Sequence, residues 1–187
     1  MKRIVFTLLS ALLLTSVTYA QSYQLDKAHA RLSFEVTHMG ISTVDGNFEN
    51  FDATLVSSKD DFTDAKITMT AQVKSINTHI EMRDNDLRKN FFEVDKYPTI
   101  TFKSTSFAKV DGNKYKLSGN LTMHGVTQPI TFDVVYNGHA VSPFTKKTSY
   151  GFTLTGTLKR SDYGINNDMH LVGDEVQLRA NVEFVKN

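Results

Sequence analysis

Residues 83–102 read RDNDLRKNFFEVDKYPTITF, and this stretch holds the clearest helix signal in a sequence otherwise patterned as strands. Leu87 and Phe91 are four residues apart and so share one helix face, which Phe92 widens. The helix must end before Pro98, because the proline ring forces the preceding residue into an extended conformation. The stretch therefore predicts a helix of about two to three turns that leads into a strand.

Local chemistry defines both ends of this stretch. Asp84 or Asp86 can accept backbone N–H bonds at the helix start, where a negative charge also suits the helix dipole. Residues 99–103 alternate polar and apolar side chains, as a half-buried strand does. The apolar helix face could be a plug that seals a core or a wall of a ligand cavity, and the two roles are compatible.

The first twenty residues have the pattern of a secretory signal peptide. Lys2 and Arg3 give a positive start, residues 4–17 are mostly apolar, and small residues lead up to Ala20. We expect cleavage after Ala20, which leaves a mature chain of residues 21–187 in the periplasm or outside the cell. A membrane anchor is the alternative interpretation of this segment.

Composition excludes several classes of function. Loss of Lys2 and Arg3 changes the net charge from +1 to −1, so no net field attracts the protein to nucleic acid or anionic lipid. The chain has no cysteine, which rules out disulfides, thiolate zinc sites and thiol catalysis. Its length suits one domain, and no segment of the mature chain is apolar enough to span a bilayer as a helix.

Most of the mature chain alternates apolar and polar residues in the manner of strands. Short turns separate these segments, which predicts antiparallel pairing. Turns are expected at residues 111–113, 124–127 and 137–138, and a loop at residues 140–147. The expected strands, about eight in number, cover residues 32–37, 44–55, 65–74, 99–110, 115–123, 130–136, 149–158 and 176–184.

One short helix cannot cover the apolar faces of this many strands. The sheet must therefore split into a sandwich or close into a barrel with an apolar interior. Small residues occupy inward positions beside large ones, and Met69 and Met123 are adaptable fillers, which together suit a hollow barrel. Ordinary packing of small residues beside large ones explains the same pattern. The small residues are Ala65, Ala71, Gly119, Gly156 and Ala180.

The sequence shows no arrangement typical of catalysis or metal binding. Its six histidines are scattered without helical or strand pairing, and no serine lies in a nucleophile elbow. Adjacent acids at residues 60–61 and 174–175 are read as solvated loop edges. We therefore predict no catalytic residue, no metal and no cofactor, apart from a bound lipid.

Two charged clusters adjoin apolar elements. One contains Arg83 and Arg88, and the other is the run at residues 159–163, KRSDY. Exposed local ion pairs that tie loops to a rim would explain them, each contributing little stability. The alternative is a polar collar for the headgroup of a ligand.

Several stretches together resemble the YceI family of exported, lipocalin-like proteins. They are YQLDKAHARLSFEVTHMGISTVDGNFENF at 23–51, the opening stretch at 83–102, LSGNLTMHGVTQPITFD at 117–133, and residues 157–162 leading to 176–182. They occur in the order of the family and span nearly the whole mature chain. One departure is Asp86, where the family often has histidine.

The resemblance implies an extended, eight-stranded antiparallel β-barrel, all-β except for one short α-helix packed at the barrel. It further implies an apolar tunnel for a polyisoprenoid chain, such as a quinone tail, or another long amphiphile, and it suggests a homodimer. We expect the polar rim of the tunnel to contain Arg83, Arg88, His124, Arg160 and Asp162. We expect ligand contacts from Phe34, Phe48, Ile67, Met69, Leu87, Phe91, Phe92, Ile100, Phe102, Leu121, Met123, Phe132, Phe152 and Leu154.

Three functions follow from these readings. The favoured hypothesis is a periplasmic or secreted carrier that holds a long isoprenoid or fatty chain. An enzyme acting on such lipids is the second, although it would need a pair of titratable groups beside the tunnel. A structural or interaction module with a solid core is the third.

Overall fold

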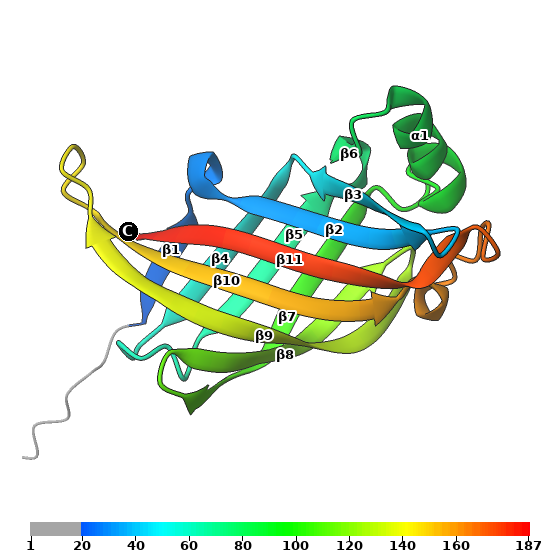
Figure 1. The fold of residues 1–187 in the computed structure, drawn as a ribbon. Coiled ribbons are helices and arrows are strands. Elements are labelled where there is room, and N and C mark those ends of the chain that lie inside the picture. Colours follow the sequence, from blue (N-terminus) through cyan, green and yellow to red (C-terminus); the bar gives the residue numbers. More distant parts are fainter. Residues whose placement is uncertain (1–19) are drawn as a thin grey trace, which may run out of the picture.

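Eight antiparallel strands close into a barrel in the computed structural model, which describes residues 20–187 (Figure 1). The strands are β1 (Gln21–Leu25), β2 (Arg31–His38), β3 (Ser42–Phe48), β4 (Phe51–Ser57), β5 (Lys66–Gln72), β6 (Ile76–Asn77), β7 (Thr99–Asp111), β8 (Lys114–Met123), β9 (Val126–Val141), β10 (Thr148–Lys159) and β11 (Val172–Lys186). The helical elements are η1 (Lys27–His29), η2 (Val73–Ser75), α1 (Glu81–Asp86), the π-helical turn η3 (Leu87–Phe91) and η4 (Arg160–Tyr163).

The closed ring runs β1–β4–β5–β7–β8–β9–β10–β11 and returns to β1. β1 completes it by pairing on both edges, with Tyr23 opposite Leu55 of β4 and Leu25 opposite Phe184 of β11. This closure confirms the predicted eight-stranded barrel and excludes the sandwich.

Three further strands extend the wall at one end of the barrel. β2 follows β1 along the same edge of β11, with Leu32 opposite Ala180, and β3 and β6 add to it. α1 lies beside β6 and β3 at this end (Figure 1). Among residues 20–187, no helix has the length and apolar character needed to cross a bilayer.

Alternation of side chains builds the core as the sequence predicts. β8 shows it most plainly, because Tyr115, Leu117, Leu121 and Met123 are buried while the intervening Lys116 and Asn120 are exposed. A strand directs successive side chains to opposite faces, so each strand supplies one apolar face to the interior.

The helix and one turn differ from the sequence prediction. Helical structure begins at Glu81, earlier than an aspartate cap at residue 84 or 86 would place it. β9 runs on to Val141, so the turn expected at residues 137–138 is absent and the reversal falls in residues 142–147.

An aromatic plug closes the barrel at the end where β1 lies. Phe62, from the β4–β5 loop, is 1% exposed and sits at the centre. Its ring lies 5.4 to 5.9 Å from the rings of Tyr23, Tyr136, Tyr150 and Phe152, mostly edge to face. Aromatic pairs prefer this geometry, so the plug is a tightly packed seal.

A carboxylate holds the loop that carries Phe62. Asp64 accepts bonds from the Ser57 hydroxyl at 2.5 Å and from the Ser58 backbone N–H at 2.9 Å. The Ser58 hydroxyl also donates to it at 2.5 Å. These bonds stabilise the ionised form and lower the pKa of Asp64 well below its usual value.

The Asp64→Asn variant should therefore change how stability depends on pH. A lowered folded-state pKa contributes stability at neutral pH, and this contribution is lost as pH falls below the ordinary carboxyl pKa of about 4. We expect the variant to be about 1–2 kcal/mol less stable at pH 7. Its stability should also fall less steeply on acidification.

Urea unfolding at a series of pH values measures both effects. A variant whose stability falls with acid in parallel with the wild type would contradict the role given to Asp64.

Candidate functional site

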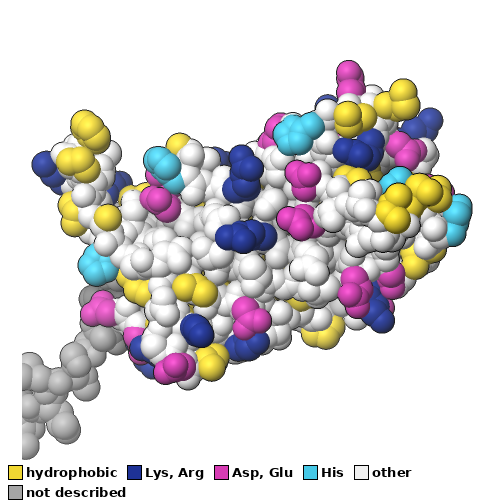
Figure 2. All heavy atoms as spheres, viewed as in Figure 1, with side chains coloured by type: hydrophobic (Ala, Val, Ile, Leu, Met, Phe, Trp, Pro, Cys, Tyr) yellow, Lys and Arg dark blue, Asp and Glu magenta, His cyan; other side chains and the backbone are white. Residues whose placement is uncertain are grey.

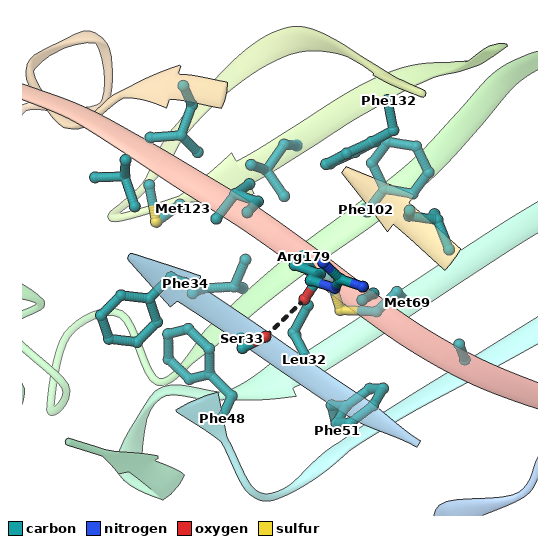
Figure 3. Close-up of a pocket in the computed structure, with 18 of the residues that line it drawn as sticks. Leu32, Ser33, Phe34, Phe48, Phe51, Met69, Phe102, Met123, Phe132 and Arg179 are labelled. Atoms are coloured by element: carbon teal, nitrogen blue, oxygen red, sulfur yellow. Dashed lines mark hydrogen bonds between the residues drawn. The ribbon is translucent and has the colours of Figure 1, made fainter. Parts of the chain in front are cut away.

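A long, narrow cavity runs through the barrel (Figure 3). Its volume is about 220 Å³, larger than the roughly 150 Å³ apolar cavity that suffices to hold a benzene molecule. Along β11 its wall extends from Val172 to Phe184, which at about 3.3 Å per residue is a path of roughly 40 Å. These proportions suit a chain better than a compact molecule.

The wall of the cavity is almost wholly apolar. Only three of its 34 residues, Ser33, Arg160 and Arg179, have polar side chains. Ser33 and Arg179 occupy outward positions of β2 and β11, where the Ser33 hydroxyl donates to the Arg179 carbonyl at 3.2 Å. Arg160 is thus the one polar side chain of the wall that comes from an inward position.

All fourteen residues expected to contact a ligand lie in this wall, although their contact with a ligand stays a prediction. Both methionines are among them, and Figure 3 shows Met69 and Met123 at separate points along the cavity. The fourteen are Phe34, Phe48, Ile67, Met69, Leu87, Phe91, Phe92, Ile100, Phe102, Leu121, Met123, Phe132, Phe152 and Leu154.

Sequence reasoning named fewer than half of the wall residues. Phe51 of β4 was missed although it lies in the alternating frame of its strand. Phe107 of β7 was missed because a bulge between Ser104 and Ser106 shifts the alternation set by Ile100 and Phe102. β2 and β11 contribute seven of the others through their inward positions. These are Leu32, Val36, Val176, Leu178, Ala180, Val182 and Phe184.

Two glycines let large rings lie back against the wall. A Cβ on Gly156 would be 2.6 Å from the Phe132 ring, and one on Gly119 would collide with the Phe102 ring. The two rings then meet edge to face with centroids 5.7 Å apart. At these positions a small residue makes room for a large neighbouring side chain, as the packing interpretation proposed. The two rings lie against the wall and leave the centre of the barrel open.

The π-helical turn η3 brings three apolar side chains to the cavity. The Phe92 N–H donates to the Leu87 carbonyl five residues earlier, at 2.9 Å. In a regular α-helix, residues five apart differ by about 140° around the axis. The wider turn places Leu87, Phe91 and Phe92 together in the cavity wall, where the Phe92 ring packs edge to face on Phe48 at 6.1 Å.

Asp84 anchors the start of this helical segment, but it does not cap the helix in the expected way. Ile80 is the N-cap residue and makes no side-chain bond. The buried Asp84 carboxylate instead reaches back to Thr78, accepting from its N–H at 2.8 Å and its hydroxyl at 2.6 Å. The helix is thereby fixed to the strand segment before it.

The arginines of the expected polar rim bond to the main chain. Arg83 donates to the Thr78 carbonyl at 2.7 Å, and Arg88 donates to the Ile76 carbonyl at 2.6 Å. Neither lines the cavity, and among residues 20–187 neither has an acid within ion-pair distance. The ion pairs proposed for these residues are therefore wrong, although a role in tying loops together fits.

Arg160 is a buried structural clamp at one end of the cavity. The residue is 5% exposed. Its guanidinium donates hydrogen bonds of 2.7 to 3.0 Å to four backbone carbonyls, those of Ile165, Asn167, Val172 and Gly173. Burial lowers its pKa, and two nearby aspartates oppose that shift. The clamp holds the η4–β11 loop, and its charge lies over the Phe91 ring at 5.9 Å.

His124 joins three elements at the same end. Its Nδ1 lies 3.1 Å from the Tyr163 carbonyl, and its Nε2 lies 3.6 Å from a Glu93 oxygen. The ring also packs on Tyr97. His124 does not line the cavity, and Asp162 is exposed, so a headgroup contact for the five rim residues stays a prediction.

One group of side chains outside the cavity has ligand types suited to a metal. Asp26, His29 and Glu183 bring their ligand atoms within 4.8 Å of one another near η1. Asp26 already accepts from the Ala28 N–H at 3.0 Å and pairs with His29 at 3.0 Å. This pairing raises the pKa of His29 and lowers that of Asp26, which accounts for the cluster as a cap of η1.

Comparison with known proteins adds to this geometry. A YceI-like domain matches residues 23–184. Protein YceI of Salmonella arizonae is 35% identical over 184 residues, which is 97% of this chain and 95% of that protein. The structure of a Campylobacter jejuni YceI protein superposes with a TM-score of 0.72 at 28% identity, covering 100% of this chain and 99% of the other.

A more distant structure shares the fold. It is a polyisoprenoid binding domain from Saccharophagus degradans, with a TM-score of 0.64 at 15% identity, covering 88% of this chain and 98% of the domain. The match to the YceI-like domain takes in nearly all of the described residues, and the identity to the Salmonella protein extends over almost the full length of both chains. The chain belongs to the YceI-like family.

Proposed function

We propose that the protein is a carrier that holds one long apolar chain inside its barrel, in the periplasm or outside the cell. The cargo is an isoprenoid tail, as in quinones and polyprenyl lipids, or a fatty amphiphile. The observation that carries this proposal is the long, narrow cavity whose wall is apolar except for Arg160 at one end and two residues in outward strand positions. The signal-peptide pattern, which lies outside the described residues apart from Ala20, supports export.

The energetics favour a chain of several units. Burial of one five-carbon isoprene unit contributes about 4 kcal/mol before costs, at about 0.8 kcal/mol per carbon. Ordering of a flexible chain and lost freedom on association offset part of this gain. Retention during purification therefore needs several buried units, which the length of the cavity allows.

The lack of spare polar groups supports carriage over catalysis. Among the described residues, no carboxylate or histidine lines the cavity, and the Arg160 guanidinium is engaged with four carbonyls. General acid–base chemistry needs a titratable group within reach of the reacting atoms. The polyisoprenoid binding domain of similar fold is consistent with this choice.

Extraction of protein purified from its native host is the first test. Mass spectrometry of the solvent extract should identify a lipid with a long isoprenoid or fatty chain. Repeated absence of any lipid would contradict the proposal, and turnover of prenyl phosphates or quinones by the purified protein would favour the enzyme instead.

A tryptophan placed inside the cavity should compete with the cargo. Leu154 lines the cavity from β10, whereas its neighbour Thr155 is exposed on the outer face. We expect Leu154→Trp to weaken retention of an apolar fluorescent probe by at least about tenfold, which corresponds to a loss of about 1.4 kcal/mol. Thr155→Trp is the matched control and should bind as the wild type does.

Both tryptophan variants should give the circular dichroism spectrum of the wild type. Equal probe affinity for the wild type and Leu154→Trp would show that the cavity is not the binding site.

A charge on the π-helical turn should abolish retention. Phe92 contributes its ring to the wall, and a carboxylate in that place would have to lose its hydration against an apolar chain. We expect Phe92→Asp to be purified without lipid and Phe92→Leu to keep it. Recovery of the same amount of lipid from folded Phe92→Asp would contradict the contact.

The homodimer suggested by the family resemblance also stays a prediction. Sedimentation velocity of the purified protein measures it directly, with a dimer expected and a monomer at all concentrations counting against it.

A further inference from the structure

The hairpin of β9 and β10 extends beyond the barrel. β8 pairs with β9 only up to Val135, whereas β9 and β10 stay paired as far as Val141 opposite Thr148. On its other edge, β10 stays paired with β11 up to Ser149 opposite Val185. Residues 137–151 are called the ribbon below, and its two-stranded tip, from Val141 to Thr148, projects from the end of the molecule away from α1 (Figure 1).

The ribbon is braced where it leaves the barrel. The register shifts between Gly151 and Phe152, and Gly138 has a φ of +109°, which only glycine adopts readily. The Asn137 amide donates to the Thr153 hydroxyl at 3.0 Å. A bulge of this kind re-aims a strand, so the ribbon has a defined direction.

The tip of the ribbon carries the most exposed large apolar side chain in residues 20–187. Phe144 is 93% exposed, and Val141 is 59% exposed. The Ser142 hydroxyl accepts from the Thr145 N–H at 3.2 Å, and the Lys146 N–H donates to the Ser142 carbonyl at 3.0 Å. This turn exposes the Phe144 ring to solvent, so the ring is not buried against the barrel and its apolar surface does not stabilise the fold.

The charges around Phe144 have one sign. Residues 137–151 contain Lys146 and Lys147 and no acid. Figure 2 shows hydrophobic and basic side chains side by side at this tip. An aromatic ring beside lysines fits the interface of an anionic membrane, because the ring inserts among the lipids while the ammonium groups stay at the headgroups.

We propose that the tip of the ribbon docks the protein on the surface of an anionic phospholipid bilayer. The proposal goes beyond carriage of a lipid, because it concerns an outer surface and does not depend on what the cavity holds. A second copy of this chain meeting tip to tip is less suited as the partner, since a two-fold contact would bring the lysines of both tips together.

Co-sedimentation with vesicles tests the proposal. The full mature protein is mixed with vesicles of phosphatidylcholine alone or of equal parts phosphatidylcholine and phosphatidylglycerol. We expect binding to the anionic vesicles, weaker at high salt, and little binding to phosphatidylcholine alone. Each lysine near an anionic surface strengthens binding by about fivefold.

Variants at the tip should act without unfolding the barrel. Phe144→Ala should weaken vesicle binding by about tenfold through lost apolar burial. Lys146→Glu with Lys147→Glu should weaken it by more than about twenty-five-fold and remove the salt dependence. Ile41→Ala is the matched control and should bind as the wild type does. Ile41 is 84% exposed in the turn between β2 and β3, and this turn lies at the end of the molecule near α1 (Figure 1).

Several outcomes would overturn the proposal. Absence of wild-type binding to anionic vesicles is one, and loss of binding in Ile41→Ala but not in Phe144→Ala is another. A shift from dimer to monomer in Phe144→Ala without any vesicle binding would identify a second copy as the partner. Lipid content measured by mass spectrometry should be the same in all these variants, which separates this test from the test of carriage.

Discussion

The structure depends on one constraint, which is that eight strands each have an apolar face that must be removed from water. One short helical segment is too small to cover these faces. The strands can remove those faces from water only by turning them toward one another. β1 makes the ring complete, because it is the strand that pairs with both β4 and β11. The cavity, its apolar wall and the position of the helical segment all follow from that closure.

Polar side chains beside the cavity make most of their hydrogen bonds to the fold itself, although Arg88 Nε and His124 Nε2 are buried without a hydrogen-bond partner among the described residues. Asp84, Arg83 and Arg88 fix the helical segment to the strand segment before it, and Arg160 fixes the η4–β11 loop. Buried polar groups are costly unless they are hydrogen-bonded, which explains why these side chains turn to main-chain atoms. The wall of the cavity is left almost wholly to apolar side chains.

The sequence was a good guide to the fold and to part of the site, for identifiable reasons. Period-two alternation placed inward residues such as Met69 and Met123, because a strand leaves no freedom in which face a side chain takes. Phe62 could not be placed in this way, since it lies in a polar loop and is buried only through contacts with strands far away in sequence. The reach of β9 past Asn137 was missed because an Asn-Gly pair is a strong turn signal. There the pair instead forms part of a bulge.

The packing of phenylalanine rings against Gly119 and Gly156 affects the width of the cavity. At Gly119 and Gly156 the absence of a Cβ atom lets the neighbouring rings lie close to the barrel wall, which widens the cavity at these two points. A methyl at Gly156 would push the Phe132 ring toward the axis and narrow the passage there, whereas a methyl at Gly119 would meet both the Phe102 ring and the Lys103 carbonyl. These two backbone positions therefore set the width of the passage at two separate points.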